Sequence, residues 1–228
     1  MTLTEEAAPA ALRQRHVRVR RYEPIERLAH WWVACCFVLT LLTGASVRHH
    51  RQGLISSGLI WHLISAGALI LGLLLLFALP GRRSLWKGFS ALLRLSAVDW
   101  KLLRSPWSLL HRTRGGPAPW GKYNLGQKLA AYLLVLLMVG LCATGIAAAL
   151  AGHRLGAPHG AFVALTVIVL LGHVFLALVN PSTRPALRGM LTGWVDRSWA
   201  EHHHPAWLEE LEARDLEQQP AGGSSHGS

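Results

Sequence analysis

Four long apolar segments limit what this chain can fold into. Each is long enough to cross the roughly 30 Å hydrocarbon core of a bilayer as a helix, which takes about 20 residues. Because 51% of the residues are hydrophobic and only 15% are charged, the chain is too apolar for a soluble domain of this size. The sequence therefore predicts an all-α membrane protein with four transmembrane helices, over residues 29–47, 54–79, 129–151 and 157–180.

Lysine and arginine are distributed unevenly among the segments that connect these spans. Of the 23 such residues, 20 lie in residues 1–28, the 80–128 connection and the 181–228 tail, and three lie in the two short turns. By the positive-inside rule, both termini and the long loop are expected in the cytoplasm, around a membrane bundle of residues 29–180. This topology explains the net charge of +11, so no nucleic-acid partner is expected.

The segments outside the spans differ in pattern. Basic and bulky apolar residues alternate over residues 84–110, which predicts one or two amphipathic helices on the cytoplasmic leaflet. Contact with anionic lipid alone is the simplest role for such a surface. The tail is amphipathic and then acidic, whereas nothing in residues 1–21 is expected to build a core.

Two histidines lie on one face of the fourth span. His159 and His173 are fourteen residues apart, which brings them to within about 40° of each other and separates them by roughly 21 Å along a helix. An imidazole inside a membrane needs a polar partner and is most often retained as a metal ligand or a proton carrier. Two unrelated histidines, one at the interface and one bonded to a neighbouring helix, are the alternative.

The first and second spans each carry one further histidine in apolar surroundings. In an up-down-up-down bundle, His30 and His173 lie near the cytoplasmic side, and His62 and His159 lie near the outer side. Four neutral imidazoles in two pairs, with no thiolate or carboxylate nearby, suit two six-coordinate b haems better than zinc or copper. The pattern predicts a di-haem cytochrome b bundle that transfers electrons. A haem-free transporter whose histidines relay protons is the alternative from another class.

A Thr-Gly pair recurs near the ends of the first and third spans. Thr43 and Gly44, like Thr144 and Gly145, are small enough to let a flat cofactor or another helix approach the backbone. Plain helix packing explains these positions equally well.

Polar Asn124 and Gln127 bracket Gly126 at the inner edge of the third span. Their amide groups can bind the carbonyls of a quinone, and the glycine leaves room for its ring. A quinone that takes two electrons also needs two protons, and the cytoplasmic edge can supply them. Asparagine is also a good N-cap, so the residues alone favour a quinone site and a helix cap equally.

Several motifs resemble those of one family. ERLAHWW at the first span, WHLISAG at the second, GKYNLGQK before the third, the His159/His173 spacing and MLTGWVDRSWAEHHHPAW after the fourth resemble the cytochrome b (gamma) subunit of membrane-bound respiratory formate dehydrogenases. The resemblance covers residues 20–212. The four-histidine pattern is shared with hydrogenase and thiosulfate-reductase cytochromes b, and the KYNLGQK and tail motifs are more specific. The tryptophan-rich loop departs from the family's pattern.

The resemblance implies two sets of site residues. The ligands of the inner haem b would be His30 and His173, and those of the outer haem b would be His62 and His159. The quinone site would consist of Asn124, Gly126, Gln127 and His173.

The resemblance also implies a function and partners. The chain would anchor its complex in the bacterial cytoplasmic (inner) membrane and pass electrons from an iron-sulfur (beta) subunit to menaquinone or ubiquinone. A molybdenum- or tungsten-containing (alpha) subunit would oxidise formate. With three cysteines and no Cys-x-x-Cys, this chain has too few ligands for an iron-sulfur cluster, so those cofactors are expected in partners. The alternatives are the cytochrome b subunit of a hydrogenase or thiosulfate/polysulfide reductase-type complex, and a stand-alone di-haem cytochrome b.

Overall fold

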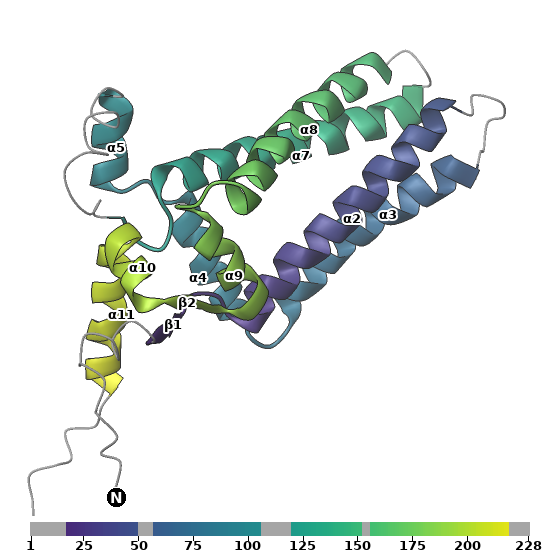
Figure 1. Cartoon of the computed structure of the whole chain (residues 1–228). Helices are drawn as coiled ribbons and strands as arrows, with labels where there is room; N and C mark the ends of the chain where they lie inside the picture. The colour runs from purple at the N-terminus through teal and green to yellow at the C-terminus, as the bar shows by residue number, and fades with distance from the viewer. Residues whose placement is uncertain (1–16, 50–56, 106–119, 152–155, 219–228) are drawn as a thin grey trace, which may run out of the picture.

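Four long helices form the body of the protein. The computed structural model describes residues 17–49, 57–105, 120–151 and 156–218 (Figure 1). Each long helix contains a stretch of 18 residues that is apolar enough to cross a membrane. They are α2 (Pro24–His49), α3 (Ser57–Ala78), α7 (Leu125–Ala151) and α8 (Gly156–Leu178). These helices confirm the predicted all-α membrane fold.

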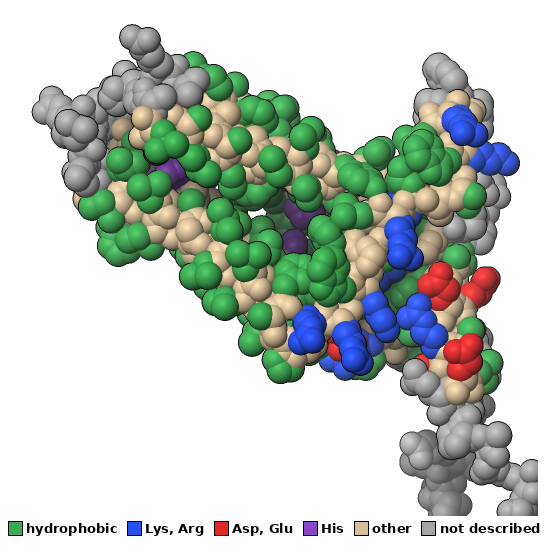
Figure 2. Space-filling model, turned by 180° about the vertical axis from the view of Figure 1, so that it is seen from behind, with side chains coloured by type: hydrophobic (Ala, Val, Ile, Leu, Met, Phe, Trp, Pro, Cys, Tyr) green, Lys and Arg blue, Asp and Glu red, His purple; other side chains and the backbone are tan. Residues whose placement is uncertain are grey.

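The long helices are arranged as two antiparallel hairpins, α2 with α3 and α7 with α8 (Figure 1). A glycine allows close packing within each hairpin. The Trp32 indole lies against Gly72, and the Phe162 ring lies against Gly140, where a β-carbon would overlap them. The two hairpins make few contacts with each other. Figure 2 shows a hollow between them, with histidine side chains in its wall.

Apolar side chains cover the outside of both hairpins. Leu74 of α3, Leu150 of α7 and Ile168 of α8 are among the most exposed large apolar residues that the structure describes. Lysine and arginine side chains gather instead at one end of the helices (Figure 2). This is the surface of a protein whose helix sides face lipid and whose basic end faces water or headgroups.

Two short helices lie at the basic end, in the connection between α3 and α7. They are α4 (Arg82–Leu93), which packs on α2, α3 and α7, and α5 (Ala97–Arg104). A Ser96–Asp99 capping box begins α5. Both helices fall within residues 84–110, where one or two were expected, except that α4 begins at Arg82. Residues 106–110, and residues 54–56 of the expected second span, lie outside the described residues.

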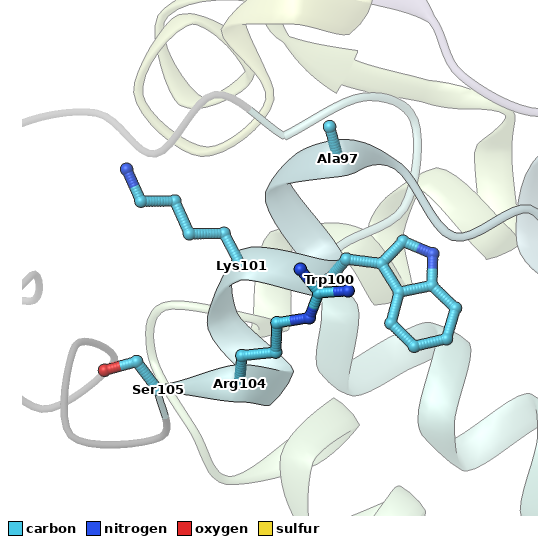
Figure 3. A pocket seen from close by; sticks show the side chains of 5 residues that line it. All are labelled: Ala97, Trp100, Lys101, Arg104 and Ser105. Carbon is cyan, nitrogen blue, oxygen red and sulfur yellow. The ribbon is translucent and has the colours of Figure 1, made fainter.

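An open pocket runs along α5, and the side chains around it project from that helix (Figure 3). It contains none of the candidate site residues. Trp100 on its rim is half exposed, and the nearby cations suit a membrane surface. The lining residues are Ala97, Trp100, Lys101, Arg104 and Ser105.

The N-terminal segment and the tail fold together into a small unit at the basic end of the helices. Strand β1 (Arg18–Arg20) pairs antiparallel with β2 (Trp194–Asp196), so that Val19 faces Val195. The tail also contains α9 (Arg184–Thr192), α10 (Arg197–His203) and α11 (Pro205–Gln218).

This unit has a core of its own. Val19 is buried with Val195, Ala200, Trp207 and Leu208. The expectation that nothing in residues 1–21 builds a core is therefore wrong for Val19. The first dozen residues, also covered by that expectation, lie outside the described residues.

Candidate functional site

The inner pair of histidines joins the two hairpins near the basic end. His30 from α2 and His173 from α8 face each other with ring centroids 6.2 Å apart and planes tilted by 50°. Trp31 packs edge-on against His30 at 5.3 Å. Neither ring has a hydrogen bond to another described residue. Each therefore keeps both ring nitrogens available.

The outer pair joins the hairpins at the opposite end. His62 from α3 and His159 from α8 have ring centroids 6.3 Å apart and planes at 88°. The His62 Nδ1 donates to the Thr40 carbonyl at 2.9 Å, and the His159 Nδ1 lies 3.1 Å from the Thr144 hydroxyl. The structure thus brings the four histidines together in the two pairs expected from the sequence. Their role as ligands stays a prediction.

The spacing of both pairs fits a single metal ion between two imidazoles. A metal–nitrogen bond of about 2.0–2.1 Å, with roughly 1.1 Å from nitrogen to ring centre, places two opposed ring centroids about 6.3 Å apart. No group of three or more histidine, cysteine or acidic residues in the described ranges could hold a metal. Because each pair supplies only two ligands, the others would have to come from the cofactor, as they do in a porphyrin.

The candidate quinone residues at the start of α7 form a reciprocal cap. The Asn124 Oδ1 accepts the Gln127 N–H at 2.9 Å, and the Gln127 Oε1 accepts the Asn124 N–H at 3.0 Å. The capping role that the sequence allowed is therefore present. The side-chain nitrogens, Asn124 Nδ2 and Gln127 Nε2, donate no hydrogen bond to a described residue. Gly126 is exposed, and a β-carbon there would approach only the Asn124 Oδ1, at 3.4 Å.

The packing of α7 against α8 places this cap at nearly the same depth as His173. Gly140 contacts Phe162, and Thr144 contacts His159. Because the helices are antiparallel, the same alignment puts His173 level with Ala130. Gln127 lies three residues nearer the basic end, which is about 4.5 Å along the axis.

Two buried side chains that sequence reasoning missed support the segment before this cap. The Arg21 Nη2 donates to the Lys122 carbonyl at 2.6 Å, and the His204 Nδ1 donates to the Gly121 carbonyl at 2.8 Å. Arg21 also donates to the His204 Nε2 at 3.1 Å. Burial and the Arg21 charge lower the pKa of His204 to about 3, so it is neutral at pH 7. The tail motif marked this region, but no local pattern singled out His204 within its triple histidine.

Two ion pairs flank the same segment. Lys122 binds Glu26 of α2 at 2.7 Å, and Lys128 binds Asp99 of α5 at 2.6 Å. Asp99 is completely buried. Burial raises its pKa, but the hydrogen bonds from Lys128 and Ser96 outweigh this and keep the pKa below its usual value. The start of α7 is therefore held from α2, α5 and the tail together.

Two hairpins whose histidines meet in pairs at two depths define a membrane cytochrome of the b type. Residues 21–193 match the prokaryotic cytochrome b561 family, and the chain belongs to this family. It is an integral membrane protein that carries haem b and serves in electron transfer, as a component of an oxidoreductase system.

Similar curated proteins are cytochrome subunits of formate dehydrogenases, as the sequence motifs predicted. The formate dehydrogenase cytochrome b556 subunit of Haemophilus influenzae is 27% identical over 212 residues, which cover 88% of this chain and 87% of the relative. The nitrate-inducible cytochrome b556(Fdn) subunit of Escherichia coli K12 is 26% identical, with 87% and 94% covered. The cytochrome b556(fdo) subunit of the same strain is 24% identical, with 87% and 95% covered.

Proposed function

We propose that this chain is the membrane-anchoring, quinone-reducing cytochrome b subunit of a formate dehydrogenase complex. It carries electrons through two b haems from an iron-sulfur (beta) subunit to menaquinone or ubiquinone. The formate is oxidised on a molybdenum- or tungsten-containing (alpha) subunit. The observation that carries this proposal is the pairing of four histidines at two depths, with ring spacings of 6.2 and 6.3 Å. The similarity to formate dehydrogenase subunits supports the choice of complex.

The complex resides in the bacterial cytoplasmic (inner) membrane, with both termini of this chain in the cytoplasm. The positive-inside distribution supports this orientation. It places His30 and His173 on the inner side, and His62 and His159 on the outer side. The exposed cations and Trp100 of α5 then contact membrane lipid at the cytoplasmic leaflet.

Each histidine pair holds one haem, which supplies reversible one-electron chemistry when bound. His30 and His173 ligate the inner haem, and His62 and His159 ligate the outer haem. Two imidazoles leave no open coordination position, so these residues favour electron transfer and exclude oxygen from the iron. The fourteen residues between His159 and His173 on α8 separate the two sites by roughly 21 Å.

The quinone binds at the inner edge, between Asn124, Gly126, Gln127 and His173. The capping box uses the oxygen atoms of the two amides and leaves their N–H groups to donate to a quinone carbonyl. His173, which has no hydrogen bond to a described residue, can offer its second nitrogen. Cytoplasmic water at this edge supplies the two protons that quinone reduction consumes.

Haem content tests the ligand assignment. Replacing His62 with leucine removes one outer ligand, so we expect the haem-to-chain ratio to fall from two to one with the spectrum of the inner haem intact. His202→Leu is the matched control because His202 is exposed on the tail. A wild-type ratio of one, or loss of both haems from a folded His62→Leu chain, would contradict the pairing.

The capping geometry provides a test of the quinone site that leaves the helix intact. Gln127→Glu and Asn124→Asp keep the capping oxygen and remove only the amide donor. We expect both variants to retain normal haem content and normal reduction by the donor, and to be reoxidised more slowly by added menaquinone or ubiquinone.

Asn180→Asp is the control for the added charge, because it makes the same change in a turn at the cytoplasmic end of α8, where its Oδ1 accepts from Ser182. If all three variants were reoxidised at the wild-type rate, Asn124 and Gln127 would be capping residues alone.

A further inference from the structure

The repeated Thr-Gly pairs each accommodate one histidine of the outer pair. A β-carbon at Gly44 would lie 3.1 Å from Cε1 and 3.2 Å from Nδ1 of His62. At Gly145 the corresponding distances to His159 are 3.3 and 3.6 Å. What approaches the backbone at both positions is therefore an imidazole from the second helix of the same hairpin.

The two threonine hydroxyls are oriented in the same way. The hydroxyl of each donates to the carbonyl four residues earlier, at 2.8 Å for Thr43 and 2.6 Å for Thr144. This leaves the hydroxyl oxygen free to accept. The His159 Nδ1 donates to the Thr144 oxygen at 3.1 Å.

His62 is held mainly by the backbone. Its Nδ1 donates to the Thr40 carbonyl at 2.9 Å, and the Thr43 oxygen lies further away, at 3.5 Å. Since a carbonyl can only accept, Nδ1 carries the hydrogen, and Nε2 is the nitrogen left to bind a metal.

The inner pair lacks this support. Neither His30 nor His173 has a hydrogen bond to another described residue. The difference has a chemical consequence. A ligating imidazole that donates its other N–H to an oxygen becomes more basic, and a more basic ligand stabilises the oxidised metal.

We propose that Thr43–Gly44 and Thr144–Gly145, here called the two Thr-Gly cradles, are positioning residues for the outer haem. Together with the Thr40 carbonyl, they fix the tautomer and orientation of His62 and His159 and lower the midpoint potential of the outer haem. This inference rests on the proposed ligation of that haem by these two histidines. Its effect is to favour passage of electrons from the outer haem, where they enter, to the inner haem.

Redox titration of the full-length chain with its bound haems tests the hydroxyl contact. Thr144→Val keeps the side-chain shape and removes the oxygen that accepts from His159. We expect the outer haem to titrate at a higher potential, with two haems still bound and the inner potential unchanged. Thr144→Ser should restore the wild-type value. Thr43→Val should shift the potential less, because the Thr43 oxygen lies 3.5 Å from the His62 Nδ1, whereas the Thr144 oxygen lies 3.1 Å from the His159 Nδ1.

Thr166→Val is the matched control, because the Thr166 hydroxyl donates to the Phe162 carbonyl at 2.7 Å and holds no histidine. If Thr144→Val titrated like Thr166→Val, or shifted both haems equally, the cradle proposal would be overturned. A wild-type chain with fewer than two haems would instead overturn the proposed function, and the cradle with it.

The glycines give a second, spectroscopic test. Gly44→Ala places a methyl group 3.1 Å from the His62 ring, so we expect a changed electron paramagnetic resonance signal of the outer haem or its loss. Gly145→Ala, with 3.3 Å available, should change the signal less. The inner signal should stay constant in both variants. An unchanged outer signal in Gly44→Ala, or an inner signal that changes as much as the outer one, would contradict the cradle.

Discussion

Arg21 carries a positive charge into the buried part of the small unit that β1 forms with the tail. Its guanidinium lies over the rings of Tyr22, Trp199 and Trp207, at 5.0 to 5.5 Å from their centres. Aromatic faces and accepting carbonyls together replace the water that the cation gives up. Its Nη1 has no hydrogen-bond partner within the described part of the chain. Arg21 therefore depends on its neighbours staying uncharged, above all His204.

We expect acid to weaken this contact. The pKa of His204 is about 3 in the folded protein, lowered by burial and by Arg21, against about 6.5 in an unfolded chain. The unfolded state thus binds more protons between these values, so stability is full above pH 6.5 and is lost as the pH falls. Between pH 7 and pH 5 the loss is about 2 kcal/mol. Thermal unfolding of the tail at each pH, monitored by limited proteolysis, measures this loss of stability.

The variant His204→Asn separates the contribution of His204 to this pH dependence from that of other titrating groups. Asparagine keeps a polar group but cannot be protonated, so the variant should lose most of the difference between pH 5 and pH 7. An unaltered pH dependence in His204→Asn would assign the acid sensitivity to other groups.

The sequence predicted which residues lie together where their depth in the membrane determined their position. His30, His62, His159 and His173 could be paired because a polar residue in an apolar helix is rare and its depth follows from helix rise. The contact between Arg21 and His204 could not be predicted in this way, because the two residues are 183 positions apart and neither lies in an apolar segment. No local pattern indicates such a contact.

At the scale of elements, apolar composition located the helices but not their beginnings. The helix α2 begins at Pro24 and α7 at Leu125, each several residues before its apolar segment. The reason is that a helix begins at its cap, whereas apolar sequence begins at the edge of the lipid. Strands β1 and β2 were not expected, since three-residue strands are too short to show alternation.

The docking of α5 depends on a buried ion pair. Asp99→Asn keeps an oxygen for the Ser96 cap but leaves the Lys128 charge without its partner. Breaking a buried pair in this way costs about 3–5 kcal/mol. We expect a correspondingly lower unfolding temperature and faster proteolysis at α5. Asp99→Asn combined with Lys128→Met should recover much of the loss, because no unpaired charge remains.

An exposed pair serves as the control for Asp99. Glu201 binds Arg197 at 2.9 Å at the surface of the tail. Such pairs contribute at most about 1 kcal/mol, so Glu201→Gln should change the unfolding temperature little. Equal effects of Asp99→Asn and Glu201→Gln would show that the Asp99 contact does not anchor α5.

At the scale of the whole molecule, the two hairpins pack within themselves and meet each other mainly through the histidine pairs. Under the proposed ligation, haem would fill the interior that a soluble bundle fills with side chains. The sequence could predict the number and direction of the helices, but not the hollow between them, because apolar composition is the same on helix faces toward lipid and toward haem.

Removing haem should therefore separate the hairpins. A ligand at 1,000 times its Kd stabilises the folded state by about 4 kcal/mol, and two haems contribute independently. We expect chains made without haem synthesis to unfold at a lower temperature and to be cleaved by protease between α4 and α7, with each hairpin remaining intact. Equal melting temperatures for the haem-free and haem-bound chains would contradict this expectation.

The pairing of β1 with β2 has a consequence for the order of biosynthesis. Strand Arg18–Arg20 is made before all four membrane helices, yet its partner, Trp194–Asp196, follows them. At 5–20 residues per second, the ribosome takes roughly 10–35 s to deliver that partner. Until then Val19 and Arg21 have no burial site. The strand pair can close only after the last helix has been inserted, and so a chain truncated before residue 194 leaves its N-terminal segment open to proteases.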